Sequence, residues 1–301
     1  METQLSFFPV ISQIKNSFEN AEVSVVAAPS ATAIYQLSKG VAEVIPYSFV
    51  APNSPADWAN LLGIVRDREF DVAITLTQSW SIALLLWLSG VPTRLGYSGG
   101  ANDLLLTATV PRSGGADYYS DLLGLIKVTG PAPALAVNVP RGDLATVESI
   151  AQATGLANGY VLLYPGPTPS GATYPTDSWV AILKDFQQRQ SGMPLALLQT
   201  DDAASQAAEL VSAMPDLKIL RPETPGQTAA MVAAANLLVG VAGYPLGLAI
   251  ALDVYAVGLF SSSDAVWPSR AKGDRLVTLT GDSLADIAAN QVLKKIWSEE
   301  A

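Results

Sequence analysis

Residues 236–260, NLLVGVAGYPLGLAIALDVYAVGLF, decide the fold class of this chain. An apolar run, LLVGV, is followed by a loop of small residues, AGYPLG, and then by a short apolar segment and a second run, YAVGLF. This order predicts a strand, a loop, a short helix and another strand. Because apolar runs without polar alternation are typical of parallel strands covered on both faces, the stretch predicts a βαβ unit of a parallel sheet.

The same alternation of strand-like and helix-like segments continues outward in both directions. It is interrupted at 129–140 by TGPAPALAVNVP, which is rich in Pro and Ala and indicates a linker. We therefore expect an α/β protein of two Rossmann-like domains, 1–140 and 141–301, with ligands outside the carboxyl ends of the strands. Trp58, Trp80, Trp87 and Trp179 occupy helical positions and are predicted to lie in the core.

Composition excludes several classes of function. The net charge of −10 repels phosphate backbones, so nucleic acid is not an expected partner. The chain contains no Cys and no His, which excludes disulfides and thiolate chemistry and removes the commonest general base and metal ligand. Acid–base work would fall to Asp, Glu, Lys or Tyr.

The sequence also bears on location. The longest uninterrupted apolar run, Ile82 to Leu88, is far shorter than the roughly 20 residues that a membrane-spanning helix needs. The N-terminus lacks the basic start and the long apolar segment of a signal peptide. We therefore expect a cytoplasmic protein without a transmembrane segment.

Three loops at predicted strand ends are candidate ligand sites. YPGPTPSGATYPTDSW, 164–179, could cradle a phosphate with backbone N–H groups or could be a Pro-rich loop without a ligand. VGVAGYPLGLA, 239–249, has glycines that allow either the approach of a ligand or tight packing. FSSSDAVWPS, 260–269, could contact a ribose or a base with its serines, Asp264 and Trp267, or could be a simple turn.

In this order, these loops resemble glycosyltransferase family 9, the heptosyltransferases. The resemblance is carried by FDVAITLTQSWSIALLLWLSGVPTRLGY, YVLLYPGPTPSGATYPTDSWVAIL and TAAMVAAANLLVGVAGYPLGLAIALDVYAVGLF, with weaker likeness in QLSFFPVISQIKNSFENAEVSVV and ANDLLLTATVP. It implies the GT-B fold, with two Rossmann-like domains facing a central cleft. It also implies metal-independent, inverting transfer of a heptose-type sugar from a nucleotide donor to a glycan or lipopolysaccharide-type acceptor, with a carboxylate as base.

The chain departs from the family at its functional letters. The family's first strand would precede QLSFFP and is missing, and the family's Asp falls on Thr3, beside Glu2. Met1 could therefore be an internal residue of a longer chain. The basic pair of the phosphate loop falls on Ala172 and Thr173, and the Asp and His of the second loop fall on Ala242 and Gly247. We interpret this as a site whose chemistry is largely removed, so that activity is weak or lost.

The catalytic candidates are Thr3, at the position of the family's Asp, and Glu2 or Asp264, either of which could replace that base. No metal ligand is expected. No cofactor is expected beyond an ADP-linked sugar donor, and the partners implied are this donor and a glycan acceptor, with peripheral contact to the inner membrane and room for a protein partner. The donor-binding candidates are Gly166, Thr168, Ser170, Gly171, Gly243, Tyr244, Gly247 and Ser262.

Two alternatives stay open. The first is a catalytically inactive relative that binds a ligand or a protein, which is favoured by the simultaneous loss of the acid, the His and the basic pair. The second is a sugar-nucleotide epimerase of similar double-Rossmann architecture, although such enzymes also depend on His, which this chain lacks.

Overall fold

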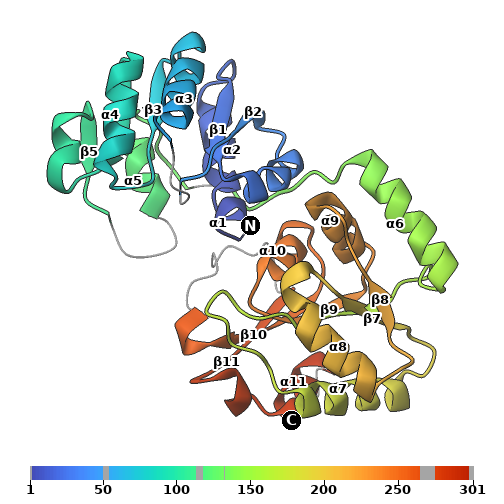
Figure 1. Cartoon of the computed structure of the whole chain (residues 1–301). Coiled ribbons are helices and arrows are strands. Elements are labelled where there is room, and N and C mark those ends of the chain that lie inside the picture. Colours follow the sequence, from blue (N-terminus) through green and yellow to red (C-terminus); the bar gives the residue numbers. More distant parts are fainter. Residues whose placement is uncertain (1, 50–53, 113–117, 132, 265–274, 298–301) are drawn as a thin grey trace. The chain divides into compact units, whose positions relative to one another are not determined.

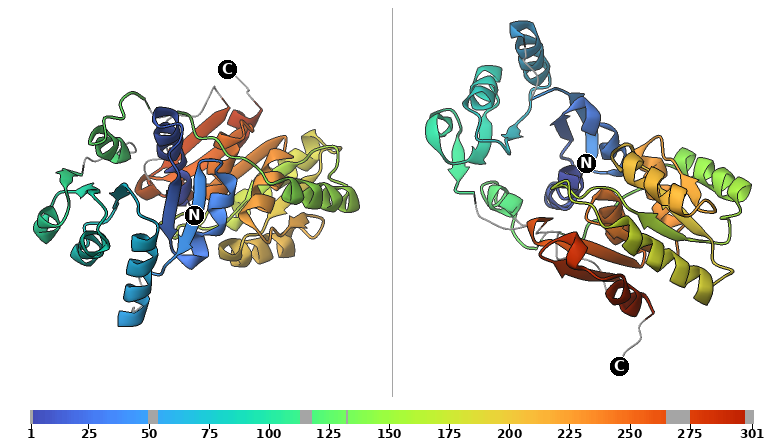
Figure 2. Two further views of the ribbon diagram at one scale, coloured as in Figure 1. Left: turned by 90° about the horizontal axis from the view of Figure 1, so that it is seen from above. Right: turned by 60° about the horizontal axis from the view of Figure 1, so that its bottom comes forward.

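The computed structural model of the chain describes residues 2–49, 54–112, 118–131, 133–264 and 275–297 (Figures 1 and 2). The chain folds into two compact units. The C-terminal unit consists of Met1–Ser6, Gln36–Lys39 and Ala134–Ala301, and the N-terminal unit consists of Phe7–Tyr35 and Gly40–Pro133. Residues from both ends of the chain therefore share the C-terminal unit.

A six-stranded parallel sheet forms the centre of the C-terminal unit, with the strand order β11-β10-β9-β6-β7-β8. The chain builds β6, β7 and β8 towards one edge and then crosses back to place β9 on the other side of β6. The order therefore reverses between β6 and β9, the kind of position at which α/β sheets bind ligands. The strands are β6 (Val161–Tyr164), β7 (Leu195–Leu198), β8 (Lys218–Leu220), β9 (Leu237–Val241), β10 (Ala256–Ser261) and β11 (Leu276–Gly281).

Helices cover both faces of this sheet. In the first group, α7 packs against α8 and α11 (Figure 1). In the second group, α9 packs against α6 and α10 (Figure 1). Every residue of β6, β7, β9 and β10 is buried, which confirms the prediction of parallel strands covered on both faces. The helices are α6 (Arg141–Thr154), α7 (Thr176–Arg189), α8 (Ala204–Ala213), α9 (Pro225–Ala233), α10 (Tyr244–Ala251) and α11 (Ala289–Ile296), with 3₁₀ turns η4 (Asp201–Ala203), η5 (Ser262–Asp264) and η6 (Leu284–Asp286).

Local side-chain chemistry sets the ends of these helices. The Thr224 hydroxyl accepts a hydrogen bond of 3.0 Å from the Gln227 backbone N–H and caps α9, whose first residue is Pro225. Helix α6 ends at Gly155, where φ is +77°, a left-handed conformation that favours glycine.

Helix α1 (Glu2–Leu5) also belongs to this unit and packs against α10.

The N-terminal unit contains two separate parallel sheets among its described residues. The first sheet pairs β1 with β2, and the second has the order β3-β4-β5. No described strand joins β1 to β3. The elements are β1 (Val23–Ala27), β2 (Val41–Pro46), β3 (Val72–Ile74), β4 (Thr93–Tyr97), β5 (Ala108–Val110), α2 (Phe8–Ser17), α3 (Pro55–Asp67), α4 (Trp80–Ser89), α5 (Tyr118–Gly124), η1 (Pro29–Ala31) and η3 (Gly100–Leu104), while η2 (Ala33–Leu37) runs from this unit into the other.

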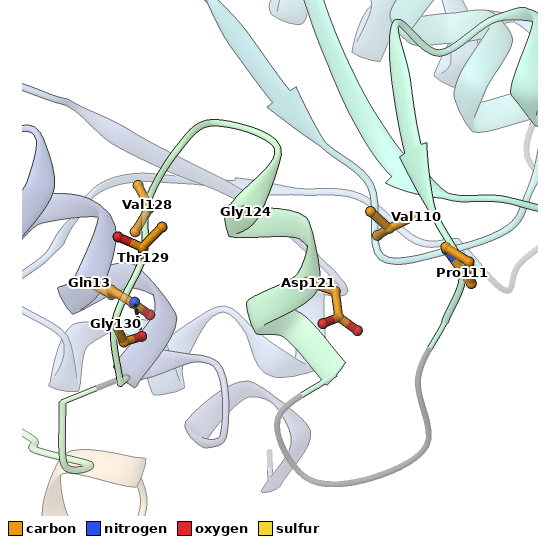
Figure 3. A pocket seen from close by; sticks show the side chains of 8 residues that line it. All are labelled: Gln13, Val110, Pro111, Asp121, Gly124, Val128, Thr129 and Gly130. Carbon is orange, nitrogen blue, oxygen red and sulfur yellow. Dashed lines mark hydrogen bonds between the residues drawn. The ribbon is translucent and has the colours of Figure 1, made fainter.

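A pocket of about 670 Å³ lies beside α2 and α5 of the N-terminal unit (Figure 3). The side-chain amide of Gln13 is buried beneath it and donates a hydrogen bond of 2.9 Å to the Gly130 carbonyl. None of the candidate residues from the sequence lines this pocket. Its lining consists of Gln13, Val110, Pro111, Asp121, Gly124, Val128, Thr129 and Gly130.

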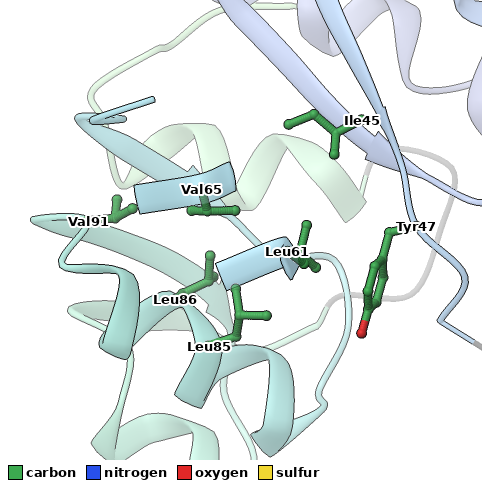
Figure 4. Close-up of a cluster of buried hydrophobic side chains, with 7 residues drawn as sticks. All are labelled: Ile45, Tyr47, Leu61, Val65, Leu85, Leu86 and Val91. Atoms are coloured by element: carbon green, nitrogen blue, oxygen red, sulfur yellow. The ribbon is translucent and has the colours of Figure 1, made fainter. Parts of the chain in front are cut away.

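A hydrophobic core links the two sheets of the N-terminal unit through side chains (Figure 4). Val26 of β1 and Ala73 of β3 both pack against this core. Because β1 and β3 share no strand pairing, apolar packing rather than a hydrogen-bonded ladder connects the two sheets. The buried members of the cluster are Ile45, Tyr47, Leu61, Val65, Leu85, Leu86 and Val91.

The structure corrects the prediction for two of the tryptophans. Trp179 is buried and Trp58 packs against the core of Figure 4, but Trp80 and Trp87 of α4 are 59% and 52% exposed. Helix α4 carries apolar residues around most of its circumference, so its sequence gives no periodic signal that selects one face.

Among the described residues, no helix is both long enough and apolar enough to span a membrane.

Candidate functional site at the carboxyl edge of the C-terminal sheet

The three candidate loops lie next to one another along one edge of the C-terminal sheet. They follow β6, β9 and β10, and because these strands are parallel, their carboxyl ends meet at the same edge. Strand β9 pairs with both β6 and β10. The loop after β9 therefore lies between the loop after β6 and the loop after β10, at the point where the strand order reverses. The structure thus brings together the loops after β6 and β10, which are almost a hundred residues apart in the sequence.

The loop after β6 is closed by its own hydrogen bonds. The backbone N–H of Thr168 donates to the Ala172 carbonyl at 2.8 Å, and that of Gly171 donates to the Thr168 carbonyl at 2.8 Å. Gly171 has φ = +84°, which explains the glycine. The Thr168 hydroxyl is buried and lies 2.8 Å from that of Ser170. The loop is therefore an ordered turn with hydroxyls on one side.

Asp264 joins this loop to the loop after β10. Its carboxylate accepts a hydrogen bond of 2.8 Å from the Ser170 hydroxyl, another of 3.2 Å from the Ser261 backbone N–H, and a third from the Ser261 hydroxyl. Burial acts to raise the pKa of Asp264, but hydrogen bonds from Ser261, Ser170 and Thr168 outweigh it and hold the pKa below its usual value. A carboxylate stabilised in this way is a weaker proton acceptor than an ordinary one.

The loop after β9 is tightly packed. Gly243 and Gly247 are buried, and the ring of Tyr164, at the end of β6, lies against Gly243. Tyr244 begins α10, and its hydroxyl lies 3.0 Å from that of Thr228. Burial raises the pKa of Tyr244 to about 12, so its hydroxyl stays neutral at physiological pH.

The remaining candidates lie as follows. The Ser262 hydroxyl donates to the Asp282 carbonyl at 3.1 Å, which ties the loop after β10 to the end of β11. Glu2 and Thr3 lie in α1, which packs against α10, but their side chains are outside the described residues, as is the whole of Trp267. The described residues contain no group of three or more acidic side chains placed to hold a metal ion.

This edge of the sheet is poor in positive charge. The described residues that directly follow these strands, 165–175 after β6, 242–243 after β9 and 262–264 after β10, contain no Lys or Arg. Arg221 follows β8 at the same edge, and its Nε donates a hydrogen bond of 3.1 Å to the Gln199 side chain. Asp201 and Asp202 follow β7. The sequence reasoning did not single out Tyr164 or Arg221. Tyr164 ends β6 and Arg221 directly follows β8, so their places at the carboxyl ends of apolar runs are the signal that could have found them.

Comparisons with known proteins agree with this geometry. The sequence model of glycosyltransferase family 9 (heptosyltransferase) matches residues 58–295. Lipopolysaccharide heptosyltransferase 3 of Escherichia coli is 20% identical over 281 residues, which cover 86% of this chain and 80% of that protein.

Solved structures share the fold. The glycosyltransferase family 9 protein of Veillonella parvula superimposes with a TM-score of 0.83 at 15% identity, covering 98% of this chain and 93% of that one. The E. coli heptosyltransferase WaaC with ADP-2-deoxy-2-fluoro heptose gives a TM-score of 0.71 at 16% identity, covering 99% and 96%. The α/β architecture with parallel sheets is therefore the GT-B architecture of these enzymes. With its sheet order, its adjacent loops and a family match over most of its length, this chain belongs to glycosyltransferase family 9.

Proposed function

We propose that this protein binds a nucleotide-linked, heptose-type sugar at the carboxyl edge of its C-terminal sheet and has weak or no transfer activity. The observation that carries the proposal is the meeting of the loops after β6, β9 and β10 at the point where the strand order reverses. The backbone of Gly166, Gly171 and Gly243 would face the diphosphate, and the hydroxyls of Thr168, Ser170 and Ser262 the sugar or ribose. Residues 141–301 would thus form the donor side, and residues 1–140 the acceptor side.

The reaction, where it occurs, would be metal-independent and inverting, with a carboxylate taking the proton from an acceptor hydroxyl of a glycan or lipopolysaccharide. Support for an ADP-linked donor comes from WaaC, whose solved structures contain ADP or an ADP-heptose analogue. A cytoplasmic location with peripheral contact to the inner membrane belongs to the same proposal.

Two features favour weak activity. The described residues that directly follow β6, β9 and β10 at this edge include no Lys or Arg, and each charge-assisted contact that a diphosphate forgoes is worth roughly 1.5–3 kcal/mol. Asp264 accepts hydrogen bonds from the hydroxyls of Ser170 and Ser261 and from the Ser261 backbone N–H, which lowers its value as a base. Glu2 and Thr3 are the other positions at which a base could act in this proposal.

Calorimetric titration of ADP and ADP-heptose, followed by an assay of sugar transfer and donor hydrolysis, tests the proposal. Gly171→Ala should strain the loop after β6 and weaken ADP binding by about tenfold. Gly155→Ala is the matched control, because Gly155 has nearly the same left-handed φ but ends α6, away from the loop. Absence of ADP binding up to millimolar concentration would contradict the proposal.

A second candidate function is a ligand-binding relative without catalysis, which the restrained Asp264 and the absence of His favour. The same two assays separate the candidates. Micromolar ADP binding without turnover of any donor would support the binding protein, whereas turnover that Asp264→Ala abolishes would support the enzyme.

A further inference from the structure

The ring of Tyr164 fills a crevice lined by three glycines at the reversal point of the C-terminal sheet. Tyr164 is the last residue of β6 and is only 1% exposed. A Cβ placed on Gly166 would lie 2.6 Å from the ring Cζ and from the hydroxyl oxygen, and one on Gly243 would lie 2.7 Å from Cε1. A Cβ on Gly240 would lie 3.0 Å from the Tyr164 Cβ. One aromatic side chain therefore touches backbone from β9 and from both flanking loops.

These contacts give the glycines a specific partner. Distances under 3.0 Å are shorter than real Cβ contacts, so any side chain at Gly166 or Gly243 would have to displace the ring. The sequence left two explanations for the glycines of the loop after β9, which are approach by a ligand and tight packing. In this structure the glycine that precedes α10 accommodates the protein's own tyrosine.

The position of the ring bears on ligand binding, because it lies between the two loops that the proposed function assigns to the diphosphate. Glycine backbone allows a phosphate to approach N–H groups closely, but only where no side chain lies in between. The hydroxyl end of Tyr164 lies where a side chain on Gly166 would begin, and its ring edge lies where a side chain on Gly243 would begin. A diphosphate and this ring would compete for the same backbone.

We propose that Tyr164 is a residue that sets nucleotide affinity and specificity in this chain, by occupying the crevice that a diphosphate would enter. The inference rests on the proposed function, because it concerns the same edge of the sheet. With the ring in place, a nucleoside diphosphate reaches the backbone of Gly166 and Gly243 only after the side chain moves out. A smaller side chain at position 164 leaves the crevice open.

Titration of ADP and of inorganic pyrophosphate into the wild type, Tyr164→Ala and Tyr164→Val tests this inference. Both variants should bind each probe at least about tenfold more tightly than the wild type. Valine suits the end of a strand and so provides a second variant if the alanine protein fails to fold. Tyr164→Phe keeps the ring and should bind within about twofold of the wild type.

Tyr160→Ala is the matched control. Tyr160 precedes the opposite end of the same strand, is equally buried, and donates its hydroxyl to the Met231 carbonyl. Its removal should lower the melting temperature comparably without tightening ADP or pyrophosphate.

The possible outcomes separate the two proposals. If the wild type binds ADP and neither Tyr164 variant binds more tightly, Tyr164 does not limit binding, and the proposed function stands without the inference. If no variant binds either probe, both fail. Tighter binding by Tyr160→Ala as well would also overturn the inference, because a general loosening of the unit would then explain the effect.

Discussion

The Ser170 hydroxyl donates a hydrogen bond of 2.8 Å to the carboxylate of Asp264, and so fastens the loop after β6 to the loop after β10. The two residues are separated by 94 positions in the sequence. This bond, together with those from Ser261, makes Asp264 a structural link between the candidate loops as well as a candidate catalytic group. Whatever the site binds, its shape depends on this carboxylate.

Asp264→Asn should therefore destabilise the C-terminal unit by about 1–2 kcal/mol, because an amide nitrogen would meet hydroxyl and backbone donors in place of an acceptor oxygen. Urea unfolding followed by circular dichroism measures the change. Asp282→Asn, at the end of the neighbouring strand β11, serves as the control and should change stability by less than about 0.5 kcal/mol. Equal losses in the two variants would argue against the linking role.

The contribution of Asp264 should also depend on pH. Its folded-state pKa is lower than the ordinary value of about 3.9, so its stabilisation is present above that value and is lost as the pH falls through the folded-state pKa. The stability difference between the wild type and Asp264→Asn should accordingly shrink between about pH 5 and pH 3. A difference that stays constant over this range would contradict the hydrogen-bonded, ionised state.

Buried tyrosines should make the protein sensitive to alkali. Burial raises the pKa values of Tyr35 and Tyr244 to about 12 and raises that of Tyr160 further. Because these folded-state values exceed the unfolded value of about 10, stability is intact below pH 10 and is lost as the pH rises through about 12. Absorbance at 295 nm should show these tyrosines ionising together with unfolding. Tyr244→Phe should reduce by one the number of tyrosines that ionise in this high-pH transition.

A capping box supports the start of α3. The Ser54 hydroxyl accepts a hydrogen bond from the Asp57 backbone N–H, while the Asp57 carboxylate accepts one from the Ser54 backbone N–H. Ser54→Ala should cost about 1 kcal/mol and speed amide hydrogen exchange in 55–67. Ser79 precedes α4 without a capping hydrogen bond, so Ser79→Ala should leave exchange in α4 nearly unchanged. Equal effects would contradict the cap.

Because Trp80 and Trp87 are exposed and Trp179 is buried, replacing the exposed pair and replacing Trp179 should change fluorescence quenching in opposite directions. Replacing both by Phe should lower the Stern–Volmer constant for acrylamide, because the accessible emitters are lost. Trp179→Phe should raise it, because that variant loses a buried emitter. A Stern–Volmer constant that rises or stays unchanged in the variant lacking Trp80 and Trp87 would mean that these side chains are covered in solution.

Much of the fold could be predicted because parallel strands leave a strong local signal. LLVGV, AGYPLG and YAVGLF became β9, the loop with the start of α10, and β10. The order of the strands also implied that their loops meet at one edge. The exposed face of α4 could not be predicted, because a helix with apolar residues on nearly every side has no sequence periodicity that indicates which side is buried.

The candidate site was predictable in its loops but not in its contacts. Ser170 and Asp264 were both candidates from the sequence, yet nothing local indicated that they bond to each other. The same holds for Tyr164, whose ring touches glycines on two other segments. Such contacts depend on register and rotamer in three dimensions, which a pattern along the chain does not encode.

The packing of α1 against α10 has a consequence for the order of events during synthesis. Helix α1 is made long before α10, and the two belong to one unit only because the chain returns to it. Domains generally fold as units as the ribosome releases them, N-terminal parts first. Here Phe7–Tyr35 and Gly40–Pro133 can complete their own unit early, while α1, which precedes them, has no partner until α10 (Tyr244–Ala251) has been translated.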